Sequence, residues 1–304
     1  MGIPFLAQRH AFRLLLIPFR DTLFRIMNPK SLILLEFPKV ITKLKAYASF
    51  SASEALAEAL RPTSSLENAL LRQQETREAR LLVSINDSLS FQGAVDLVPL
   101  TDQTLHGMTL EAADLLSVRN TLILSRTARR VLLDNAESIP LLTALAEGLS
   151  DGGGLIDLIN RTISERGEVL DSASPELAHI RSEIKVVHAR LMDRLNRYLT
   201  DPSSSRMLQE TLITQRSGRY VLPLRAEHKG QIKAIIHDQS ASGATLFVEP
   251  IAVVELNNKF RELELAERDE VLRVLRVLSQ QIAIQAESLN QTTRAMAGID
   301  LALM

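Results

Sequence analysis

Residues 218–250 read GRYVLPLRAEHKGQIKAIIHDQSASGATLFVEP, and the hydrophobic period of the chain changes at this point. Alternate residues of the first eight are apolar, which is the pattern of a strand with one buried face. The apolar positions are Tyr220, Leu222 and Leu224. Pro223 cannot donate a ladder hydrogen bond, so it predicts that this strand lies at a sheet edge. We therefore predict a small β-module over 211–250, with strands at 218–225, 231–238 and 244–250.

The same stretch brings His237, Asp238, Ser240 and Ser242 close together in sequence, as a hydrolase nucleophile and its base would be. A nucleophile of this kind needs a base within hydrogen-bond reach and a third group that orients the base. Neighbouring strand residues point to opposite faces, so His237 and Asp238 are poorly placed to form such a relay. Small polar residues followed by Gly243 are typical of a turn. We predict a turn and no catalytic residue, and a serine hydrolase is the weakest interpretation.

Two long helical segments flank the β-module. The first begins at 174–176, Ser-Pro-Glu, which combines a capping hydroxyl, a proline at the first helical position and an acid in the first turn. Its apolar stripe is formed by Leu177, Ile180, Ile184, Val187, Leu191 and Leu195. The second segment, 251–297, contains neither proline nor glycine, so about 47 residues can form a continuous helix roughly 70 Å long. Such a helix needs a helical partner, so we predict an antiparallel arm with the β-module at its tip.

Residues 27–170 are predicted to form a helical core. The segments 51–54 (SASE) and 64–67 (SSLE) both match the capping box that marks a helix start. A further helix is predicted over 109–133. These helices carry no motif of their own, and we assign them a packing role.

Composition argues against several kinds of site. The 304 residues include no cysteine, which excludes disulfides, cysteine-ligated zinc and a thiol nucleophile. The six histidines form no ligand-like pair and no HExxH motif. A Walker A loop, GxxxxGK followed by serine or threonine, is also missing. We predict neither a metal site nor a cofactor site in this chain. The formal net charge is −1, so nucleic-acid binding would have to come from a local basic patch.

The two ends of the chain are unusual. Residues 1–26 carry four arginines and one aspartate, and their uninterrupted apolar run is too short to span a membrane. We favour a leader that is foreign to the fold, with Met27 as the natural start. An amphipathic membrane anchor is the alternative. The chain closes on IDLALM (299–304) without a turn signal, so we expect a truncated protein.

A local basic patch is the strongest candidate for a binding surface. Residues 211–250 contain five cations and three acids. The alternation puts Arg219 and Arg225 on the face opposite the apolar one, where they can reach phosphate, although a merely solvated strand face is the alternative. Binding by so modest a patch would be independent of sequence and strongly salt-dependent. The candidate nucleic-acid-binding residues are Arg216, Arg219, Arg225, Lys229 and Lys233.

Residues 218–250, followed by ELNNKFRELELAERDE (255–270), resemble the second bacterial paralogue of MutS. The segments SASPELAHIRSEI (172–184) and MNPKSLILLEFPKVITKL (27–44) are similar to earlier parts of the same family. The resemblance covers about 27–304. It implies a leader (1–26), a MutS-like helical core (27–170), an ascending lever helix (171–210), a β clamp (211–250) and a truncated returning lever helix (251–304).

The resemblance also implies a function for a longer parent protein. Its MutS-type ATPase, which uses ATP and Mg²⁺ and forms a homodimer, and its small nuclease domain would lie beyond Met304. Such proteins are expected in the cytoplasm, without a membrane, where they bind branched DNA and suppress recombination, or bind ribosomal RNA in collided ribosomes and rescue them. We expect this chain alone to be inactive as an enzyme and to clamp nucleic acid. The alternative is a helical scaffold that binds protein partners through the long arm.

Overall fold

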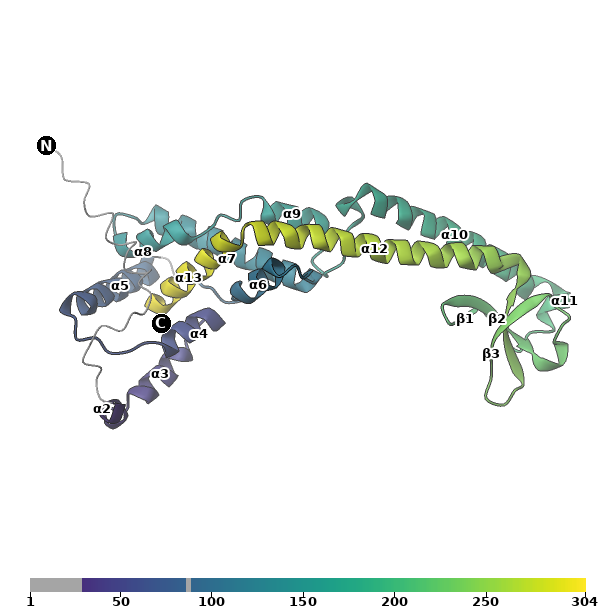
Figure 1. Cartoon of the computed structure of the whole chain (residues 1–304), viewed down its shortest axis with the longest axis horizontal. Coiled ribbons are helices and arrows are strands. Elements are labelled where there is room, and N and C mark those ends of the chain that lie inside the picture. The colour runs from purple at the N-terminus through teal and green to yellow at the C-terminus, as the bar shows by residue number, and fades with distance from the viewer. Residues whose placement is uncertain (1–28, 86–88) are drawn as a thin grey trace. The chain divides into compact units, whose positions relative to one another are not determined.

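The computed structural model describes residues 29–85 and 89–304 (Figure 1), so the expected leader over 1–26 lies outside the described residues. The chain is mainly helical with one small antiparallel sheet, as predicted. It divides into two compact units. Unit 1 comprises residues up to 160 together with 165–167 and 276–304, and unit 2 comprises 161–164 and 168–275.

Unit 1 is built around the last helix of the chain. Helix α13 (Ala286–Leu303) packs against helices from the start of the unit, and its buried side chains include Leu289, Met296 and Ile299. The surrounding core contains Phe50, Leu82, Phe91, Leu132 and Leu142. The other helices are α2 (Pro29–Leu34), α3 (Phe37–Lys45), α4 (Ser51–Glu58), α5 (Leu66–Ile85), α6 (Val98–Leu105), α7 (Ala112–Asp134), α8 (Pro140–Leu145), η1 (Ala146–Gly148) and α9 (Leu155–Thr162), whose last two residues belong to unit 2.

Two buried carboxylates join distant segments of unit 1. Glu78 of α5 accepts hydrogen bonds from the main-chain nitrogens of Leu141 and Leu142, at 2.8 and 3.0 Å, at the start of α8. A negative charge is stabilised there by the unpaired amides of a helix start. Asp300 of α13 accepts hydrogen bonds from both the main-chain nitrogen and the hydroxyl of Ser49, just before α4. These contacts fix the ends of helices around the core.

Unit 2 contains two helices that run antiparallel, as the apolar stripes predict. These are α10 (Pro175–Thr200) and α12 (Val254–Ile284), whose last residues belong to unit 1. Leu177 clusters with Val274, Val187 with Phe260, and Leu191 with Val253. Residue numbers increase along α10 from Leu177 to Leu191, while those of the residues packed against them decrease from Val274 to Val253. The two segments therefore run antiparallel. Helix α10 begins as predicted, because the hydroxyl of Ser174 accepts a hydrogen bond from the nitrogen of Leu177.

The sheet of unit 2 has the strand order β1-β2-β4-β3 and is antiparallel throughout. Its inner face packs onto α10, and the buried residues there include Leu191, Leu222 and Val248. The strands are β1 (Thr214–Arg216), β2 (Arg219–Arg225), β3 (Ala234–Gln239) and β4 (Thr245–Pro250). The short elements are η2 (Asp171–Ala173), α11 (Pro202–Ser205), η3 (Ala226–His228) and η4 (Ile251–Val253). Strand β1 was not predicted, because three residues are too few to show a period.

The prediction that Pro223 marks an edge strand is wrong, since β2 lies between β1 and β4. The carbonyl oxygen of Pro223 accepts a hydrogen bond from the nitrogen of Gln209 at 2.8 Å. The nitrogen and carbonyl of one strand residue point to the same side, so the Pro223 nitrogen also faces Gln209. The missing N–H of Pro223 therefore removes no hydrogen bond between β2 and β4, and β2 can carry this proline although it is a central strand.

The expected continuous helix over 251–297 is interrupted. Helix α12 ends at Ile284 and α13 begins at Ala286, with Gln285 between them at φ −101° and ψ 11°. No glycine or proline marks this break. Helix α13 is buried on several sides among α4, α5 and α6, so packing within unit 1 sets its direction.

Two helix starts differ slightly from the capping-box predictions. At α4 the hydroxyl of Ser53, rather than that of Ser51, bonds to the main chain of Phe50. At α5 the hydroxyl of Ser65, rather than that of Ser64, accepts a hydrogen bond from the nitrogen of Asn68 at 3.3 Å. Helix boundaries carry an uncertainty of one or two residues in sequence patterns, and only the three-dimensional contact identifies the cap.

Candidate nucleic-acid-binding surface

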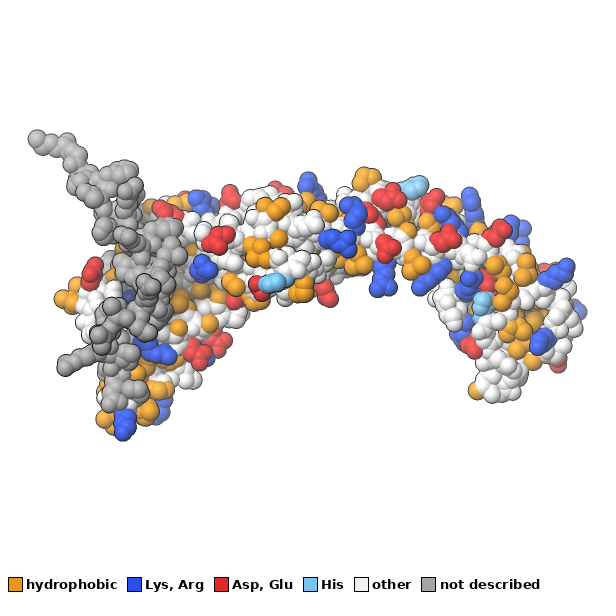
Figure 2. Space-filling view, in the orientation of Figure 1, with side chains coloured by type: hydrophobic (Ala, Val, Ile, Leu, Met, Phe, Trp, Pro, Cys, Tyr) orange, Lys and Arg blue, Asp and Glu red, His pale blue; other side chains and the backbone are white. Residues whose placement is uncertain are grey.

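The five predicted cations are all in or beside the sheet of unit 2, but their environments differ. Residues that pair directly across strands share a face, so the register places Arg216, Arg219, Val221, Pro223, Arg225, Phe247 and Glu249 on the outer face, opposite α10. Val221 and Pro223 are buried even on this side. The expected solvated face is therefore restricted to the ends of β2. Figure 2 shows Lys and Arg side chains spread over the sheet and over α10 and α12.

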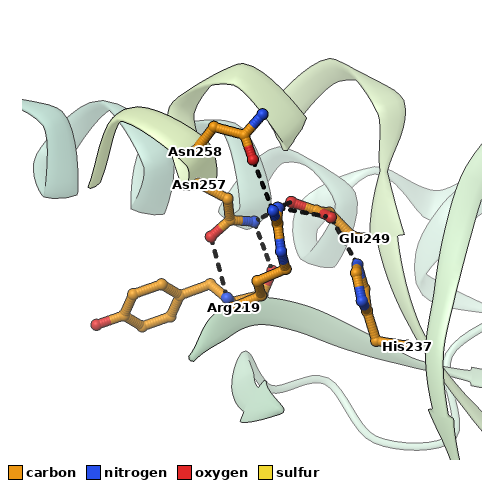
Figure 3. Close-up of polar contacts among 6 residues, drawn as sticks. Arg219, His237, Glu249, Asn257 and Asn258 are labelled. Carbon is orange, nitrogen blue, oxygen red and sulfur yellow. Dashed lines mark hydrogen bonds and ion pairs between the residues drawn. The ribbon is translucent and has the colours of Figure 1, made fainter. Parts of the chain in front are cut away.

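Arg219 is committed to a buried network (Figure 3). Its Nη1 lies 2.9 and 3.2 Å from the two carboxylate oxygens of Glu249, and its Nη2 donates to Asn258 Oδ1 at 2.6 Å. Glu249 has 0% of its side chain exposed and also accepts hydrogen bonds from His237 and Asn257. A buried carboxylate is costly unless it is paired and hydrogen-bonded, so Arg219 stabilises the fold here.

Arg216 lies over an aromatic ring. Its guanidinium carbon is 4.0 Å from the centroid of the Phe247 ring, a cation–π contact with the neighbouring part of the sheet. Its Nε lies 3.3 Å from the carboxylate of Asp238, and its Nη1 donates to the carbonyl of Gln215 at 2.8 Å. The side chain nevertheless keeps 37% of its surface exposed.

The remaining three cations lie along the connection from β2 to β3, which passes from one end of β4 to the other. Arg225 pairs with Thr245 at the start of β4, and the nitrogen of Ile251, just after β4, donates to the carbonyl of Lys233. Arg225 ends β2, Lys229 follows η3 and Lys233 precedes β3, and all three are exposed. Arg225 Nε donates to the carbonyl of Leu208 at 3.2 Å, and its closest acid is Glu227 at 4.0 Å. Within the described part of the chain, Lys229 and Lys233 form no ion pair. We call Arg225, Lys229 and Lys233, the exposed cations of this connection, the cationic corner; its two ends lie roughly 17 Å apart along β4.

One cation near this surface was missed from the sequence. Arg261 of α12 lies beside the β1–β2 turn, because a Cβ on Gly218 would be 4.0 Å from its guanidinium carbon. Arg261 also lies 3.1 Å from Glu264, an exposed helical pair. Forty-odd residues separate Arg261 from the turn, and no local pattern signals the contact.

The segment 237–243 folds as the turn chemistry predicts. A register shift between Ile236 and Asp238 makes His237 an extra residue, and its Nε2 lies 2.6 Å from Glu249. The hydroxyl of Ser240 accepts a hydrogen bond from the nitrogen of Thr245 at 3.0 Å. Gly243 has φ +73°, and its nitrogen donates to Ser240 O at 2.8 Å. His237 thus belongs to the Glu249 network, and Ser240 closes the β3–β4 turn.

The described residues lack two further kinds of feature. No group of three or more histidine, aspartate or glutamate side chains there is arranged to hold a metal ion. None of the described helices combines the length and the apolar content that crossing a bilayer requires.

The chain is similar in sequence to parts of longer bacterial proteins. No family model matches the chain. An endonuclease MutS2 of Symbiobacterium thermophilum is 38% identical over 276 residues, which is 91% of this chain and 35% of that protein. Endonuclease MutS2 of Thermomicrobium roseum is 39% identical over 280 residues, 91% of this chain and 35% of the relative. The chain is homologous to the N-terminal third of endonuclease MutS2.

The MutS2 of Geobacillus kaustophilus gives the same result, with 39% identity over 279 residues, 91% of this chain and 36% of the relative. The chain thus spans about a third of the length of the MutS2 proteins that it matches. An alignment of 276 residues in a chain of 304 leaves 28 outside it (304 − 276). Wherever it starts, the similarity to MutS2 includes α10 and the whole sheet.

Proposed function

We propose that unit 2 is a nucleic-acid-binding clamp of a MutS2-type protein, and that the cationic corner supplies its phosphate contacts. The observation that carries the proposal is the exposure of three cations within nine residues, where β2 leads into β3. Phosphate contacts by lysine and arginine supply most of the sequence-independent affinity for nucleic acid.

The charge balance of this corner supports an anionic partner. Residues 225–233 contain three cations and a single acid, Glu227, which is exposed. An exposed pair at 4.0 Å is worth little, so it leaves the Arg225 charge available to a phosphate. His228 lies 3.6 Å from the same carboxylate.

The corner is also held in place by the main chain on both sides. The nitrogen of Arg225 donates to the carbonyl of Met207 at 2.9 Å, and the nitrogen of Ile251 donates to the carbonyl of Lys233 at 3.0 Å. Cations on anchored segments lose less conformational freedom on binding than cations on a free loop. The two anchors therefore hold the cations at fixed positions along β4, as contacts to successive phosphates of a backbone require.

The homology with MutS2, whose members are named endonucleases, supports a nucleic acid as the partner. We propose DNA, including branched intermediates, or ribosomal RNA as the target of the longer protein, acting in the cytoplasm. In that protein, an ATPase domain that uses ATP and Mg²⁺ would form the homodimer. Arg216 and Arg219 were part of the predicted set, and the proposal gives Arg219 a structural role because its guanidinium is paired with Glu249.

The test is equilibrium binding of the whole chain to a fluorescently labelled duplex and to a four-way junction, measured by anisotropy at low salt. Replacing all three corner cations by glutamine should weaken binding by about tenfold or more. A matched control replaces Lys43, Arg129 and Arg130, three exposed cations of unit 1, by glutamine. Equal affinity of wild type and corner variant, with or without a loss in the control, would rule out the corner.

A second candidate, protein binding through the arm, is favoured by one observation. Leu265 and Leu272 of α12 are 47% and 43% exposed and lie seven residues apart, on one helix face. Such a face suits a partner helix, including that of a second copy. Self-association in analytical ultracentrifugation that is abolished by Leu265→Glu with Leu272→Glu, together with unchanged nucleic-acid binding by the corner variant, would favour this function.

A further inference from the structure

The guanidinium of Arg216 is held by several contacts that fix its plane. One face lies on the Phe247 ring, with 4.0 Å between the guanidinium carbon and the ring centroid. Its Nε approaches the carboxylate of Asp238 at 3.3 Å. Its Nη1 donates to the main-chain oxygen of Gln215 at 2.8 Å and lies 3.3 Å from the hydroxyl of Thr214. An arginine held in this way has already lost much of its rotamer freedom.

The second face of this guanidinium has no contact partner among the described residues. The first face is covered by Phe247, and the Nε and Nη1 edges are occupied, yet 37% of the side chain remains exposed. Among the described residues, no hydrogen bond, ion pair or ring contact occupies the face away from the ring or Nη2. A flat, cationic and immobilised surface of this kind is a partner for another flat π-system, because guanidinium planes stack on aromatic rings and on nucleobases.

The turn that follows Arg216 adds no bulky side chain beside its guanidinium. Ser217 and Gly218 form the two-residue turn between β1 and β2, with φ +53° and +75°. Positive φ at both positions is the type I′ turn of a tight hairpin. The turn carries only a hydroxymethyl group and a hydrogen as side chains, and both residues are exposed. Nothing bulky on this turn stands beside the guanidinium.

We propose that the Arg216–Phe247 stack is a platform for one unpaired nucleobase of a single-stranded segment, a proposal that rests on the nucleic-acid binding proposed above. Bases inside a duplex are already stacked on their neighbours and offer only their edges to a protein. A base that is to stack on a guanidinium must be free of a partner. The platform would thus make the clamp favour single-stranded stretches, which branched nucleic acids contain.

A phosphate contact is available beside the platform. The guanidinium of Arg261 lies next to the same turn, 4.0 Å from the position of a Cβ on Gly218, and its side chain is 55% exposed. Single-strand binding proteins combine stacking surfaces with cations that follow the backbone. Arg216 would hold the base, and Arg261 the adjoining phosphate.

The experiment uses the whole chain and a pyrimidine 15-mer that carries one 2-aminopurine, a fluorescent base that is quenched when it stacks. Deoxyribose and ribose versions separate DNA from RNA as the source of the base. Binding should quench the probe by about twofold or more in at least one of them. Arg216→Lys, which keeps the charge but removes the flat group, and Phe247→Leu, which keeps an apolar residue, should both lose this quenching at saturation.

Lys229→Gln is the matched control, because it should weaken affinity and leave the quenching at saturation intact. Cooperative urea unfolding of each variant checks that the sheet is formed. Quenching that persists in Arg216→Lys and Phe247→Leu, or binding of wild type without any quenching, would overturn the platform and leave the cationic corner standing. Failure of wild type to bind either oligonucleotide or the duplex would remove the proposed function as well.

Discussion

The side chain of Asn257 makes both hydrogen bonds of a main-chain pair with Tyr220. Its Nδ2 donates to the Tyr220 carbonyl at 3.0 Å, and its Oδ1 accepts from the Tyr220 nitrogen at 3.0 Å. The same Nδ2 donates to Glu249 at 2.7 Å, and Asn257 is only 1% exposed. One side chain of α12 thereby completes strand β2 and fixes the carboxylate at the centre of the Arg219 network (Figure 3).

Replacing Asn257 by alanine should therefore destabilise unit 2. It would leave the main chain of Tyr220 without its partners, and unpaired buried polar groups together cost about 2–4 kcal/mol. Urea unfolding followed by circular dichroism measures the change. Asn258→Ala is the matched control: this neighbour is exposed and, among the described residues, its side chain bonds only to Arg219, so its loss should cost less than about 1 kcal/mol. Equal effects of the two substitutions would contradict the assigned role of Asn257.

The Arg219–Glu249 pair should show the non-additivity of a partly buried ion pair. Glu249→Gln removes the counter-charge and should cost about 1–2 kcal/mol, a reduced figure because Arg219 is 30% exposed and screened by water. Adding Arg219→Met should cost little more, since no unpaired cation then remains. A double-mutant cycle by urea unfolding gives the coupling. Strictly additive losses would show that the two side chains do not depend on each other.

Acid should weaken unit 2 through Glu270 of α12. Hydrogen bonds from Arg273, helped by the hydroxyl of Ser174 and opposed by burial, lower the pKa of Glu270 from 4.5 to about 2. Between these values the unfolded chain binds more protons than the folded one, so the stability is complete above pH 4.5 and is lost as pH falls towards 2.

Glu270→Gln should therefore flatten the stability profile in this range of pH. The expected loss is about 1–2 kcal/mol at neutral pH, because Arg273 is half exposed, and it should shrink towards zero at the lowest pH. Urea midpoints from pH 6 down to 2.5 provide the measurement. The exposed Glu262 of the same helix, changed to glutamine, is the control. A parallel offset of the two profiles at every pH would refute the assignment.

The β1–β2 turn offers a stabilising substitution. Ser217 occupies the left-handed region at φ +53°, which serine adopts only at a cost, and Gly218 follows at φ +75°. Asn-Gly is the preferred sequence of this two-residue turn. Ser217→Asn should raise the free energy of unfolding by about 0.5–1 kcal/mol. Thermal unfolding can test this, with Ser217→Val, a β-branched residue strained at positive φ, as the destabilising counterpart. Equal melting temperatures would contradict the assigned turn type.

Local chemistry explains which parts of the fold could be predicted from the sequence. Ser174 caps α10, the three longer strands show their period, and the apolar stripes of α10 and α12 identify each other as partners. Each of these signals is contained in a short run of residues. Strand β1 and the break at Gln285 have no such signal, because a neighbouring strand and the packing of α13 determine them.

The candidate site shows the same division. The alternation of β2 identified Arg219 and Arg225 as residues of one face, and the register agrees. The partner of Arg219 could not be read from the pattern, because Glu249 lies on another strand thirty residues away. The contacts of Asn257 and Arg261 with the sheet likewise depend on where α12 crosses it. The contribution of the five predicted cations to nucleic-acid binding stays a prediction.

The most direct test of the central claim is the salt dependence of nucleic-acid binding by the whole chain. Each phosphate contact that is lost reduces the slope of log K against log salt by about 0.9 for a duplex. If Arg225, Lys229 and Lys233 contact phosphate, their joint replacement by glutamine lowers the slope by about 2–3, while the Lys43, Arg129 and Arg130 control keeps the wild-type slope. Identical slopes for wild type and corner variant would contradict the account.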